Sequence, residues 1–539
     1  MSASSKKKLR KELNAAAMTE KQLQEQKETK KLRLYTGLFA AAIAVMILVV
    51  IVSRVTGSGM LQRSTTALTV GGTKVSAAEL NHYYIDSVNG FLEQSGEYVS
   101  LFGLDTTKPL DEQFYSETDE LTWADYFLDQ ATTGAQNMYA VYNAAKAEGF
   151  TLSDEGKATI DATVENMEMT AVLRGFPSAD SYIAAVYGKG CNEKTFREYA
   201  EVQLIAQEYA VAKNESLVYD EAALDAKDAE NPAAFSAFSY HYYYMANTKF
   251  YEGGTENEDG TKTYSDEEME AGRAACEAAA NSLAAATTVE ELDAAIAALT
   301  INAEVENAKS THAHDTMYAN VPAAIQSWVT DSSRQAGDIE VIASEYTNEE
   351  GGKSVAGYYV VLFEGKDDNL TNLVNVRHIL VSYEGGTYDE TTGTTTYNDK
   401  EKQLAKSQAD EILATFQAGE QTEEAFAALA TEKTTDPGSK ENGGLYEDVY
   451  PGQMVAAFND WCFDAARKTG DTAIVETEYG CHVMYFVGTS EKTYRDTLIE
   501  TQLRSSDMSA WETGLIEAAE LVVKNTKYVQ TDLMLSGNA

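Results

Sequence analysis

The sequence predicts an α+β protein with a single N-terminal transmembrane helix, a mostly helical domain and two tandem copies of one α+β module. Three observations lead to this prediction. One run of about 20 residues is uncharged and apolar, the next part of the chain has apolar residues at helical spacing, and five residues recur 133 positions apart in the C-terminal half. A length of 539 residues also favours several domains over one core.

The apolar run covers residues 34–53, close to the roughly 20 residues that a helix needs to cross a membrane. Residues 1–33 carry ten Lys or Arg and four acids, so the positive-inside rule predicts a cytoplasmic tail. The rest is then extracytoplasmic, and we expect a single-pass protein of the cell membrane, at a bacterial cell surface. A cleaved signal peptide is the alternative, but the basic region is long for one and no Ala-x-Ala site follows the run.

Composition excludes some function classes. The chain has 42 Lys and Arg against 85 Asp and Glu, a net charge of −43, which repels a phosphate backbone and argues against nucleic-acid binding. The cysteines are too few and too scattered for a disulfide framework or a CxxC metal site. We expect buried free thiols, and the sequence leaves open whether Cys462 pairs with Cys481; the other two are Cys191 and Cys276.

Residues 66–231 are predicted to form the mostly helical domain. A strand with a Gly71-Gly72 turn comes first, and Ser76 followed by Glu79 is typical of a helix N-terminus. Apolar spacing indicates further helices near residues 121–148, 153–173 and 194–213. The C-terminal segment, residues 491–537, is too short to fold alone, so we expect its helix to complete this domain.

The repeat defines two modules, residues 233–367 and 373–490. The residues that recur are Trp328, Asp331, Arg334, Gly337 and Asp338, which return as Trp461, Asp464, Arg467, Gly470 and Asp471. Two predicted helices precede the motif in each copy, at 266–285 and 289–299 and again at 401–418 and 422–431. A β-rich run follows it, at 357–365 and 480–488.

The second copy contains several motifs in a fixed order. They are NVRHILV at residues 375–381, Asp436-Pro437-Gly438-Ser439, Gly443-Gly444, Gly452-Gln453-Met454, Phe458, and Tyr479-Gly480-Cys481-His482-Val483. In their order and spacing they resemble the parvulin family of peptidyl-prolyl cis-trans isomerases. The layout of helical domain, two modules and returning C-terminal helix is similar to that of exported foldases of the SurA and PrsA type. This similarity implies that residues 66–231 form a SurA-like chaperone domain and residues 373–490 an active parvulin domain.

The resemblance implies an active site in the second copy. Its catalytic residues would be His378, His482 and Asp436, and its substrate-binding residues Met454, Phe458, Thr477 and Tyr446. No cofactor and no metal is implied, because an X-Pro bond needs only stabilisation of its twisted amide, against a barrier of roughly 18–20 kcal/mol. The alternative is that the histidines make a mutual hydrogen bond that only braces the sheet.

The first copy lacks much of this site. His241 aligns with His378 and Tyr359 with His482, but the remaining motifs have no counterpart. We therefore expect an inactive module. The tyrosines of its first strand are either a peptide-binding face or core: Tyr240, Tyr242, Tyr243 and Tyr244.

Two further segments bear on ligands. His312, His314 and Asp315 are close in sequence, but two histidines alone are a weak metal signal, and we expect a solvated loop.

Phosphate-directed parvulins have basic residues in the loop after the first histidine. Residues 384–397 here contain three acids and no Lys or Arg, so a phosphorylated substrate would be repelled: Glu384, Asp389 and Glu390.

These features predict a membrane-anchored extracytoplasmic peptidyl-prolyl isomerase and chaperone. Its partners would be unfolded or partly folded exported proteins with X-Pro bonds, the membrane through the N-terminal helix, and no nucleic acid. The competing hypothesis is a non-catalytic client-holding protein that retains the parvulin frame.

Overall fold

The computed structural model describes residues 4–8, 46, 57–348, 351–389 and 392–532. Apart from residues 4–8 and 46, the predicted tail and apolar run lie outside the described residues. None of the helices among the described residues has the length and apolar character of a membrane span. The chain divides into two compact units, one made of Met1–Leu217 with Ser506–Ala539 and the other of Val218–Ser505.

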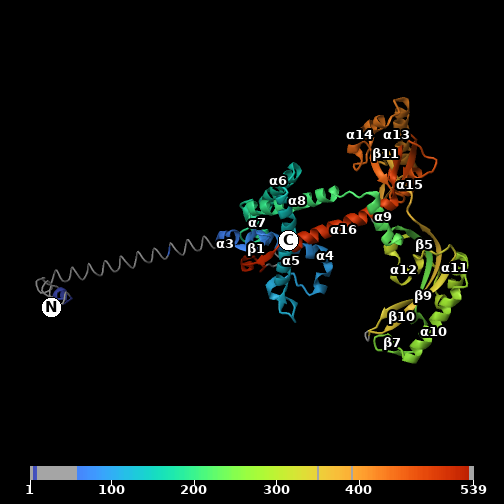
Figure 1. Cartoon of the computed structure of the whole chain (residues 1–539), viewed down its shortest axis with the longest axis horizontal. Helices are drawn as coiled ribbons and strands as arrows, with labels where there is room; N and C mark the ends of the chain where they lie inside the picture. Colours follow the sequence, from blue (N-terminus) through green and yellow to red (C-terminus); the bar gives the residue numbers. More distant parts are fainter. Residues whose placement is uncertain (1–3, 9–45, 47–56, 349–350, 390–391, 533–539) are drawn as a thin grey trace. The chain divides into compact units, whose positions relative to one another are not determined.

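The first unit is mainly helical (Figure 1). Its helices are α3 (Met60–Ser64), α4 (Ala77–Ser95), α5 (Trp123–Ala147), α6 (Asp154–Leu173), α7 (Ala179–Tyr187), α8 (Glu193–Ser216) and the end of α16 (Tyr494–Ala518). Its strands are β1 (Thr66–Val70), β2 (Thr73–Ser76), β3 (Phe114–Ser116), β4 (Leu121–Thr122) and β17 (Leu521–Val523). β1 and β2 form the predicted turn at Gly71-Gly72, and β17 joins β1 as the third strand.

The helix boundaries follow from capping and burial. The Ser76 side chain accepts from the Glu79 amide while the Glu79 carboxylate accepts from the Ser76 amide, which confirms the predicted capping box of α4. The apolar positions of α4 point into the core, where Leu80, Tyr83, Tyr84 and Val88 are buried. At the other end of the chain, Leu68 pairs with Val523 in the sheet.

The second unit contains two modules. Its helices are α9 (Glu221–Glu230), α10 (Asp266–Leu283), α11 (Val289–Ala297), α12 (Ala323–Val329), α13 (Asp399–Ala418), α14 (Glu423–Lys433), α15 (Ala456–Cys462) and the start of α16. Its strands are β5 (Ala237–Ala246), β6 (Thr255–Glu256), β7 (Lys262–Thr263), β8 (Thr311–Met317), β9 (Ile339–Thr347), β10 (Lys353–Asp367), β11 (Asn372–Ser382), β12 (Thr387–Asp389), β13 (Thr394–Thr396), β14 (Leu445–Val449), β15 (Thr472–Thr477) and β16 (Gly480–Thr493).

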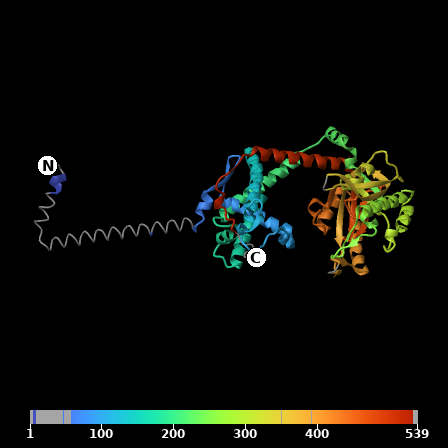
Figure 2. The same ribbon diagram turned by 90° about the horizontal axis from the view of Figure 1, so that it is seen from below.

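The two modules have the same topology. One antiparallel sheet has the order β8-β5-β10-β9 and the other β14-β11-β16-β15, so every strand of the first sheet has a counterpart in the second. In each sheet the long helix, α10 or α13, packs on one face and the short helix, α12 or α15, on the other (Figures 1 and 2). The sequence repeat therefore corresponds to a repeated fold.

The recurring residues have the same role in both copies. The guanidinium of Arg334 lies 4.6 Å from the ring centre of Trp328, and that of Arg467 lies 4.3 Å from the ring centre of Trp461. The amide of Gly337 donates to the Phe363 carbonyl at 2.9 Å. The amide of Gly470 donates to the Phe486 carbonyl at the same distance, so Phe363 and Phe486 are structurally equivalent.

This equivalence corrects the predicted alignment of His241. Counting back from the two phenylalanines places Tyr359 at the position of His482, as predicted. Tyr359 pairs with Tyr244 across the sheet and His482 pairs with Leu380, so the residue equivalent to His378 is Tyr242. His241 is therefore equivalent to Arg377 and lies on the opposite face of the sheet. A shift of one residue reverses the face, because side chains alternate along a strand.

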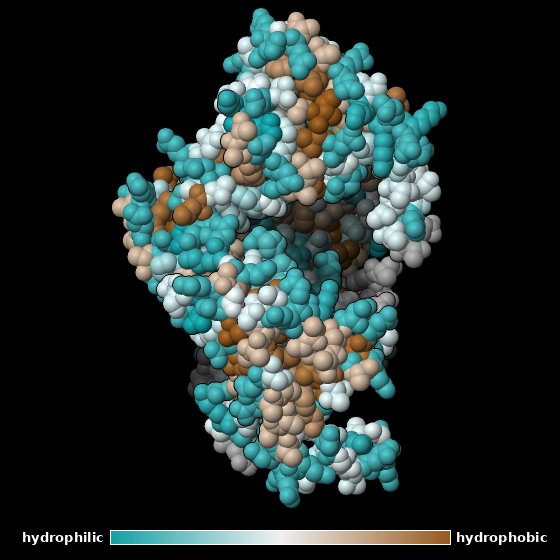
Figure 3. Space-filling model, turned by 90° about the vertical axis from the view of Figure 1, so that its right-hand side faces the viewer, coloured by the Kyte–Doolittle hydropathy of each residue, from teal (hydrophilic) through white to brown (hydrophobic). Residues whose placement is uncertain are grey.

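The surface and the thiols agree with the composition. On the face shown in Figure 3, hydrophilic side chains cover most of the surface and hydrophobic ones form separate patches.

All four cysteines are free and buried. Cys462 packs in the apolar cluster beneath α15 and Cys481 in the cluster beneath α13, so the open question of their pairing is answered in favour of free thiols.

Candidate active site

His378 and His482 lie side by side on the two central strands of the second module. His378 pairs with Met484 and His482 with Leu380, so the two histidines are diagonal neighbours on one face of the sheet. Their Nδ1 atoms are 3.0 Å apart and their rings are stacked at 5.2 Å. Both side chains are buried, with 3% and 6% of their surface exposed. The structure thus brings together two histidines that are 104 residues apart in sequence.

Asp436 lies in the connection between α14 and β14 and accepts several hydrogen bonds. Its Oδ2 is 2.9 Å from His378 Nε2 and accepts from the Tyr446 hydroxyl at 3.1 Å and the Ser439 hydroxyl at 2.5 Å. Its Oδ1 accepts from the Gly438 amide at 3.2 Å. Four donors around one carboxylate stabilise its charged form.

Ser439 is a site residue to which the sequence analysis assigned no role. It is fully buried, and its hydroxyl contacts both Asp436 and His378 Nε2, the latter at 3.0 Å. The signal was present in the Asp-Pro-Gly-Ser motif, where Ser439 stands three residues after the carboxylate. A buried serine after a tight turn is a common way to donate back to an aspartate.

One arrangement of protons satisfies every polar contact of the two rings. His378 Nε2 faces the Asp436 carboxylate, so this nitrogen carries the proton and His378 Nδ1 is an acceptor. His482 Nδ1 must then donate to His378, and His482 Nε2 accepts from the Thr477 hydroxyl at 2.9 Å. The chain Thr477, His482, His378, Asp436 is directional, with both imidazoles neutral.

The electrostatics agree with this arrangement. Burial lowers the pKa of His378, and the hydrogen bond to Asp436 only partly offsets it. Burial and the adjacent His378 lower the pKa of His482 to about 4. Burial disfavours the charged form of Asp436, but hydrogen bonds from Ser439, His378 and Gly438 outweigh it and lower its pKa to about 2. Near neutral pH the site holds one negative charge beside two neutral rings.

Burial raises the pKa of Tyr446 to about 12, and the charge of Asp436 adds to the shift. Its hydroxyl therefore stays protonated and donates to Asp436. Tyr446 and Thr477, expected as substrate-binding residues, thus direct their hydroxyl groups at the polar residues of the site.

The apolar side of the site comes from the start of α15. The Phe458 ring is nearly perpendicular to both imidazoles, with its centroid 5.6 Å from that of His378 and 5.3 Å from that of His482. Met454 is half-buried in the same apolar cluster, beside Tyr446 and Val455. Phe458 itself is 2% exposed, so its ring forms the floor of this side rather than its rim.

Gly444 shapes the backbone beneath His378. Its carbonyl accepts from the His378 amide at 2.8 Å, and its φ of 75° is left-handed. A Cβ atom here would lie 2.2 Å from the His378 carbonyl oxygen. The Gly443-Gly444 motif is therefore required by the close approach of the loop to the histidine strand.

The first module has a different set of side chains at these positions. Tyr242 and Tyr359 replace the two histidines, with ring centroids 6.1 Å apart, and Ile325 replaces Phe458. Tyr240 and Tyr242 pack with the core on this face, while Tyr243 packs on the other face with α10 and α11. Tyr244 is 38% exposed and is the exception. Because the other three tyrosines pack in the two clusters, the tyrosine strand is mainly core.

Comparisons with known proteins identify the second module. Residues 358–489 match the model of the PPIC-type PPIASE domain family. Foldase protein PrsA 1 of Listeria innocua serovar 6a is 30% identical over 161 residues, which cover 28% of this chain and 46% of that protein. Foldase protein PrsA 2 of Listeria monocytogenes serovar 1/2a is 30% identical over 111 residues, covering 19% of this chain and 36% of the relative.

The solved structures that are similar to this chain also include PrsA proteins. The crystal structure of the peptidylprolyl isomerase PrsA from Bacillus anthracis is 21% identical, covers 28% of this chain and 59% of that chain, and has a TM-score of 0.18. That score is too low to carry weight, and the chain spans about half the length of the curated relatives it matches. The assignment depends on the family model and on the foldase sequences. The chain therefore carries a parvulin-type, PPIC-type peptidyl-prolyl isomerase domain and is related through it to the PrsA foldases.

Proposed function

We propose that the chain is an extracytoplasmic peptidyl-prolyl cis-trans isomerase that assists the folding of exported proteins. The observation that carries this proposal is the hydrogen-bonded chain from His482 through His378 to Asp436, set against the Phe458 ring within the matched domain. Its substrates would be X-Pro segments of unfolded or partly folded chains, for which uncatalysed isomerisation takes tens to hundreds of seconds.

The roles of the residues follow from their contacts. Met454 and Phe458 would hold the proline ring on the apolar side of the site. His378, His482 and Asp436 would stabilise the twisted amide electrostatically, because preorganised polar groups in a water-poor site can favour the charge distribution of the twisted amide over that of the planar ground state. Tyr446, Thr477 and Ser439 would fix the protonation and orientation of these three groups.

The substrate preference follows from the loop after β11. The described part of the β12–β13 hairpin includes Asp389, and Glu384 precedes it. A phosphoserine before proline would add about −1.5 to −2 charges next to these acids. We therefore expect phosphorylated X-Pro peptides to be poor substrates.

A protease-coupled assay on the full-length protein in detergent tests the activity. Peptides that differ only in the residue before proline, including Ala, Leu, Glu and phosphoserine, give the specificity. Catalysis of the neutral peptides with a much weaker effect on the phosphopeptide supports the proposal. Isomerisation at the uncatalysed rate with every peptide would contradict it and favour a non-catalytic client-holding protein.

We also propose that residues 34–53 anchor the protein in the cell membrane, with residues 1–33 in the cytoplasm. The support is the uncharged apolar sequence and the basic tail before it. The protein should then stay in the membrane fraction after a high-salt wash, while protease added outside cells cleaves its C-terminal part. A soluble form that begins near Arg54 would show instead that the segment is a cleaved signal peptide.

A further inference from the structure

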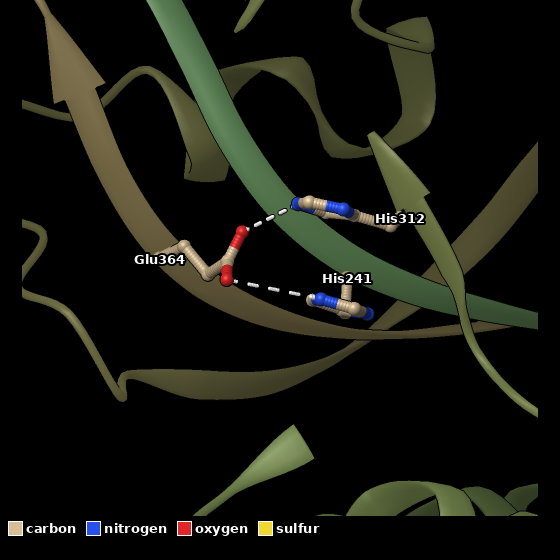
Figure 4. Close-up of side chains that lie close together, drawn as sticks. All are labelled: His241, His312 and Glu364. Carbon is tan, nitrogen blue, oxygen red and sulfur yellow. Dashed lines mark hydrogen bonds and ion pairs between the residues drawn. The ribbon is translucent and has the colours of Figure 1, made fainter. Parts of the chain in front are cut away.

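A cluster of two histidines and one carboxylate lies on the first module, on the sheet face opposite the two tyrosines that replace the catalytic histidines. His241 comes from β5, His312 from β8 and Glu364 from β10, which are adjacent strands of one sheet (Figure 4). Their possible ligand atoms all lie within 4.8 Å of one another. Neither the active site nor the repeated fold accounts for this cluster.

The sheet register places these three side chains together. His241 and His312 are direct cross-strand partners, and their rings are stacked 4.4 Å apart at an angle of 4°. Glu364 lies at a β-bulge, because Phe363 pairs with Tyr240 and Gly365 with Ser239, leaving Glu364 without a partner. Bulges turn a side chain away from the ordinary alternation, and here the carboxylate faces both imidazoles.

Hydrogen bonding fixes which nitrogen of His241 is free. The Ser310 amide and hydroxyl donate to Asp293 Oδ1 at 2.8 Å and 2.6 Å, so the hydroxyl proton is committed to Asp293. The Ser310 oxygen lies 3.0 Å from His241 Nδ1 and must accept from it. His241 then carries its proton on Nδ1, and its Nε2 has a free lone pair.

That lone pair points at another acceptor. His241 Nε2 is 3.8 Å from Glu364 Oε1, which is too far for a hydrogen bond, and the His241 side chain is only 13% exposed. The other oxygen of Glu364 is 2.7 Å from His312 Nε2. Two acceptors that face each other in a partly buried position repel, unless a cation lies between them.

The chemistry of the ligand atoms selects the kind of cation. Imidazole nitrogen suits zinc and its transition-metal neighbours, whereas calcium and magnesium take oxygen ligands almost exclusively. A second shell of hydroxyl and carboxylate behind a ligand histidine is typical of zinc sites. The negative charges of Glu364 and the nearby Asp293 and Glu290 also favour a divalent cation.

We propose that His241 Nε2, His312 Nε2 and Glu364 bind one Zn²⁺ ion, with a water molecule as the fourth ligand. The ion would tie together three strands of the first module. Because the site does not exist in the unfolded chain, zinc binding would stabilise the folded module. The sequence analysis expected no metal here, because it considered His312 with His314 and Asp315 and not with residues 71 and 52 positions away.

Comparison with the second module indicates that the cluster is specific to the first module. Arg377 stands at the position of His241, Leu445 at that of His312, and Arg377 binds Glu423 at 2.9 Å. A cation-binding cluster is therefore replaced by an ordinary ion pair in the copy that carries the isomerase motifs.

The test is zinc binding by the full-length protein, measured by calorimetry and by the shift of the thermal unfolding temperature. We expect one ion per chain at this site and a higher unfolding temperature with Zn²⁺, but not with Mg²⁺ or Ca²⁺. His312→Ala, at an exposed position, should abolish both effects, and His241→Ala should do the same. Ser310→Ala, which removes only the hydroxyl that accepts from His241 Nδ1, should weaken binding about 10- to 100-fold.

His314→Ala is the matched control, because this histidine lies two residues along the same strand, is exposed and bonds to Asp315 and Ser239 instead. Its affinity should match the wild type. Cobalt bound in place of zinc gives a second readout, since its visible absorption should disappear in Glu364→Gln. Unchanged zinc affinity in His241→Ala and His312→Ala, or equal loss in His314→Ala, would overturn the proposal.

Discussion

Among the groups that stabilise the charge of Asp436, the Ser439 hydroxyl acts most strongly. It is fully buried and shares its contact with His378, so it couples the carboxylate to the imidazole chain. Losing a hydrogen bond to a charged group costs about 1.5–3 kcal/mol, and each 1.36 kcal/mol in the barrier is tenfold in rate. We therefore propose that Ser439 is a positioning residue, which acts through Asp436 and His378.

Ser439→Ala should lower kcat/KM for a proline peptide by roughly tenfold or more, with little change in KM. It should also raise the pKa of Asp436. As the pH is lowered, the variant should therefore lose activity at a higher pH than the wild type does. The peptide isomerisation rate can be followed by NMR exchange without a coupling protease. Ser382→Ala is the control and should keep the wild-type rate: Ser382 lies on β11, the strand that carries His378, and its hydroxyl bonds to Thr435 instead of to Asp436.

The histidines predict a pH-dependent stability. The pKa of His482 falls from an ordinary 6.5 to about 4 on folding. Its contribution to stability is thus complete above pH 6.5 and is lost as the pH falls toward 4, because the unfolded chain takes up a proton that the folded chain refuses. Hydrogen exchange of the β16 amides should show this loss, and His482→Asn should reduce it. An equal pH dependence in the two proteins would mean that His482 is not neutral when folded.

The apolar residues should affect binding more than turnover. Met454→Ala removes a half-buried side chain from the proposed proline pocket, and a lost apolar contact of this size is worth roughly tenfold or more in discrimination. We expect a higher KM with nearly unchanged kcat. Phe458→Leu should act in the same direction while keeping the core filled. A fall in kcat alone would place the proline ring elsewhere.

At the scale of the elements, much of the fold could be predicted from the sequence. Capping residues and apolar spacing located α4, α5, α6 and α8, and the repeat located α10, α11, α13 and α14. These signals are local, because a helix is defined by neighbours three and four residues apart. The short α7 was missed, since its nine residues hold too little periodicity.

The register of the first module could not be predicted in the same way. Residues 240–244 are Tyr, His and three further Tyr, so neither face of the strand stands out as apolar. Register is specified by alternation, and without it the sequence alignment slipped by one residue at His241. In the second module His378 and His482 were singled out through the resemblance to the parvulin family and not through alternation, and the structure brings their rings together.

The glycine loop beneath the histidine strand gives an element-scale prediction. Gly444→Ala would place a Cβ 2.2 Å from the His378 carbonyl, so we expect loss of both folding stability and activity. Gly452→Ala is a matched control with a similar positive φ of 82° but no atom within 4 Å of the added Cβ. It should cost only the backbone strain, about 1–2 kcal/mol, and remain active. Thermal unfolding and the peptide assay together separate the two.

Within the second unit, one buried arginine connects segments far apart in sequence. Arg495 at the start of α16 bonds to the Asp228 carboxylate of α9, the Pro232 carbonyl and the Asp368 carbonyl between the two modules. Its side chain is 9% exposed, so removing it leaves Asp228 without its partner. Breaking a fully buried pair costs about 3–5 kcal/mol, and we expect a smaller loss here because the Asp228 side chain is 32% exposed.

Arg495→Ala should therefore make the segment around Pro232 and the connection around Asp368 sensitive to limited proteolysis, with fragments identified by mass spectrometry. The control is Arg273→Ala, which removes an exposed pair with Glu270 on α10 and should cost less than about 1 kcal/mol. Equal protease resistance of the Arg495 variant and the wild type would show that this junction is held by other contacts.

At the scale of the whole molecule, we propose that catalysis belongs to the second unit and client holding to the first. The isomerase motifs all lie in the second unit, whereas the first unit is a helical body completed by the C-terminal residues from Ser506 onward. A chain without residues 57–217 and 506–539 should therefore keep peptide isomerisation but suppress client aggregation less well. Loss of aggregation suppression in Asp436→Asn, with the fold intact, would place client binding on the isomerase site instead.

The most direct test of the central claim is the isomerisation rate of one X-Pro peptide, measured by NMR exchange on three full-length proteins. The account predicts acceleration by the wild type, the uncatalysed rate for Asp436→Asn combined with His482→Ala, and the wild-type rate for Tyr242→Phe combined with Tyr359→Phe. Circular dichroism checks that each variant is folded. Full activity in the folded Asp436 and His482 variant, or its loss in the folded tyrosine variant, would contradict the assignment of catalysis to the second module.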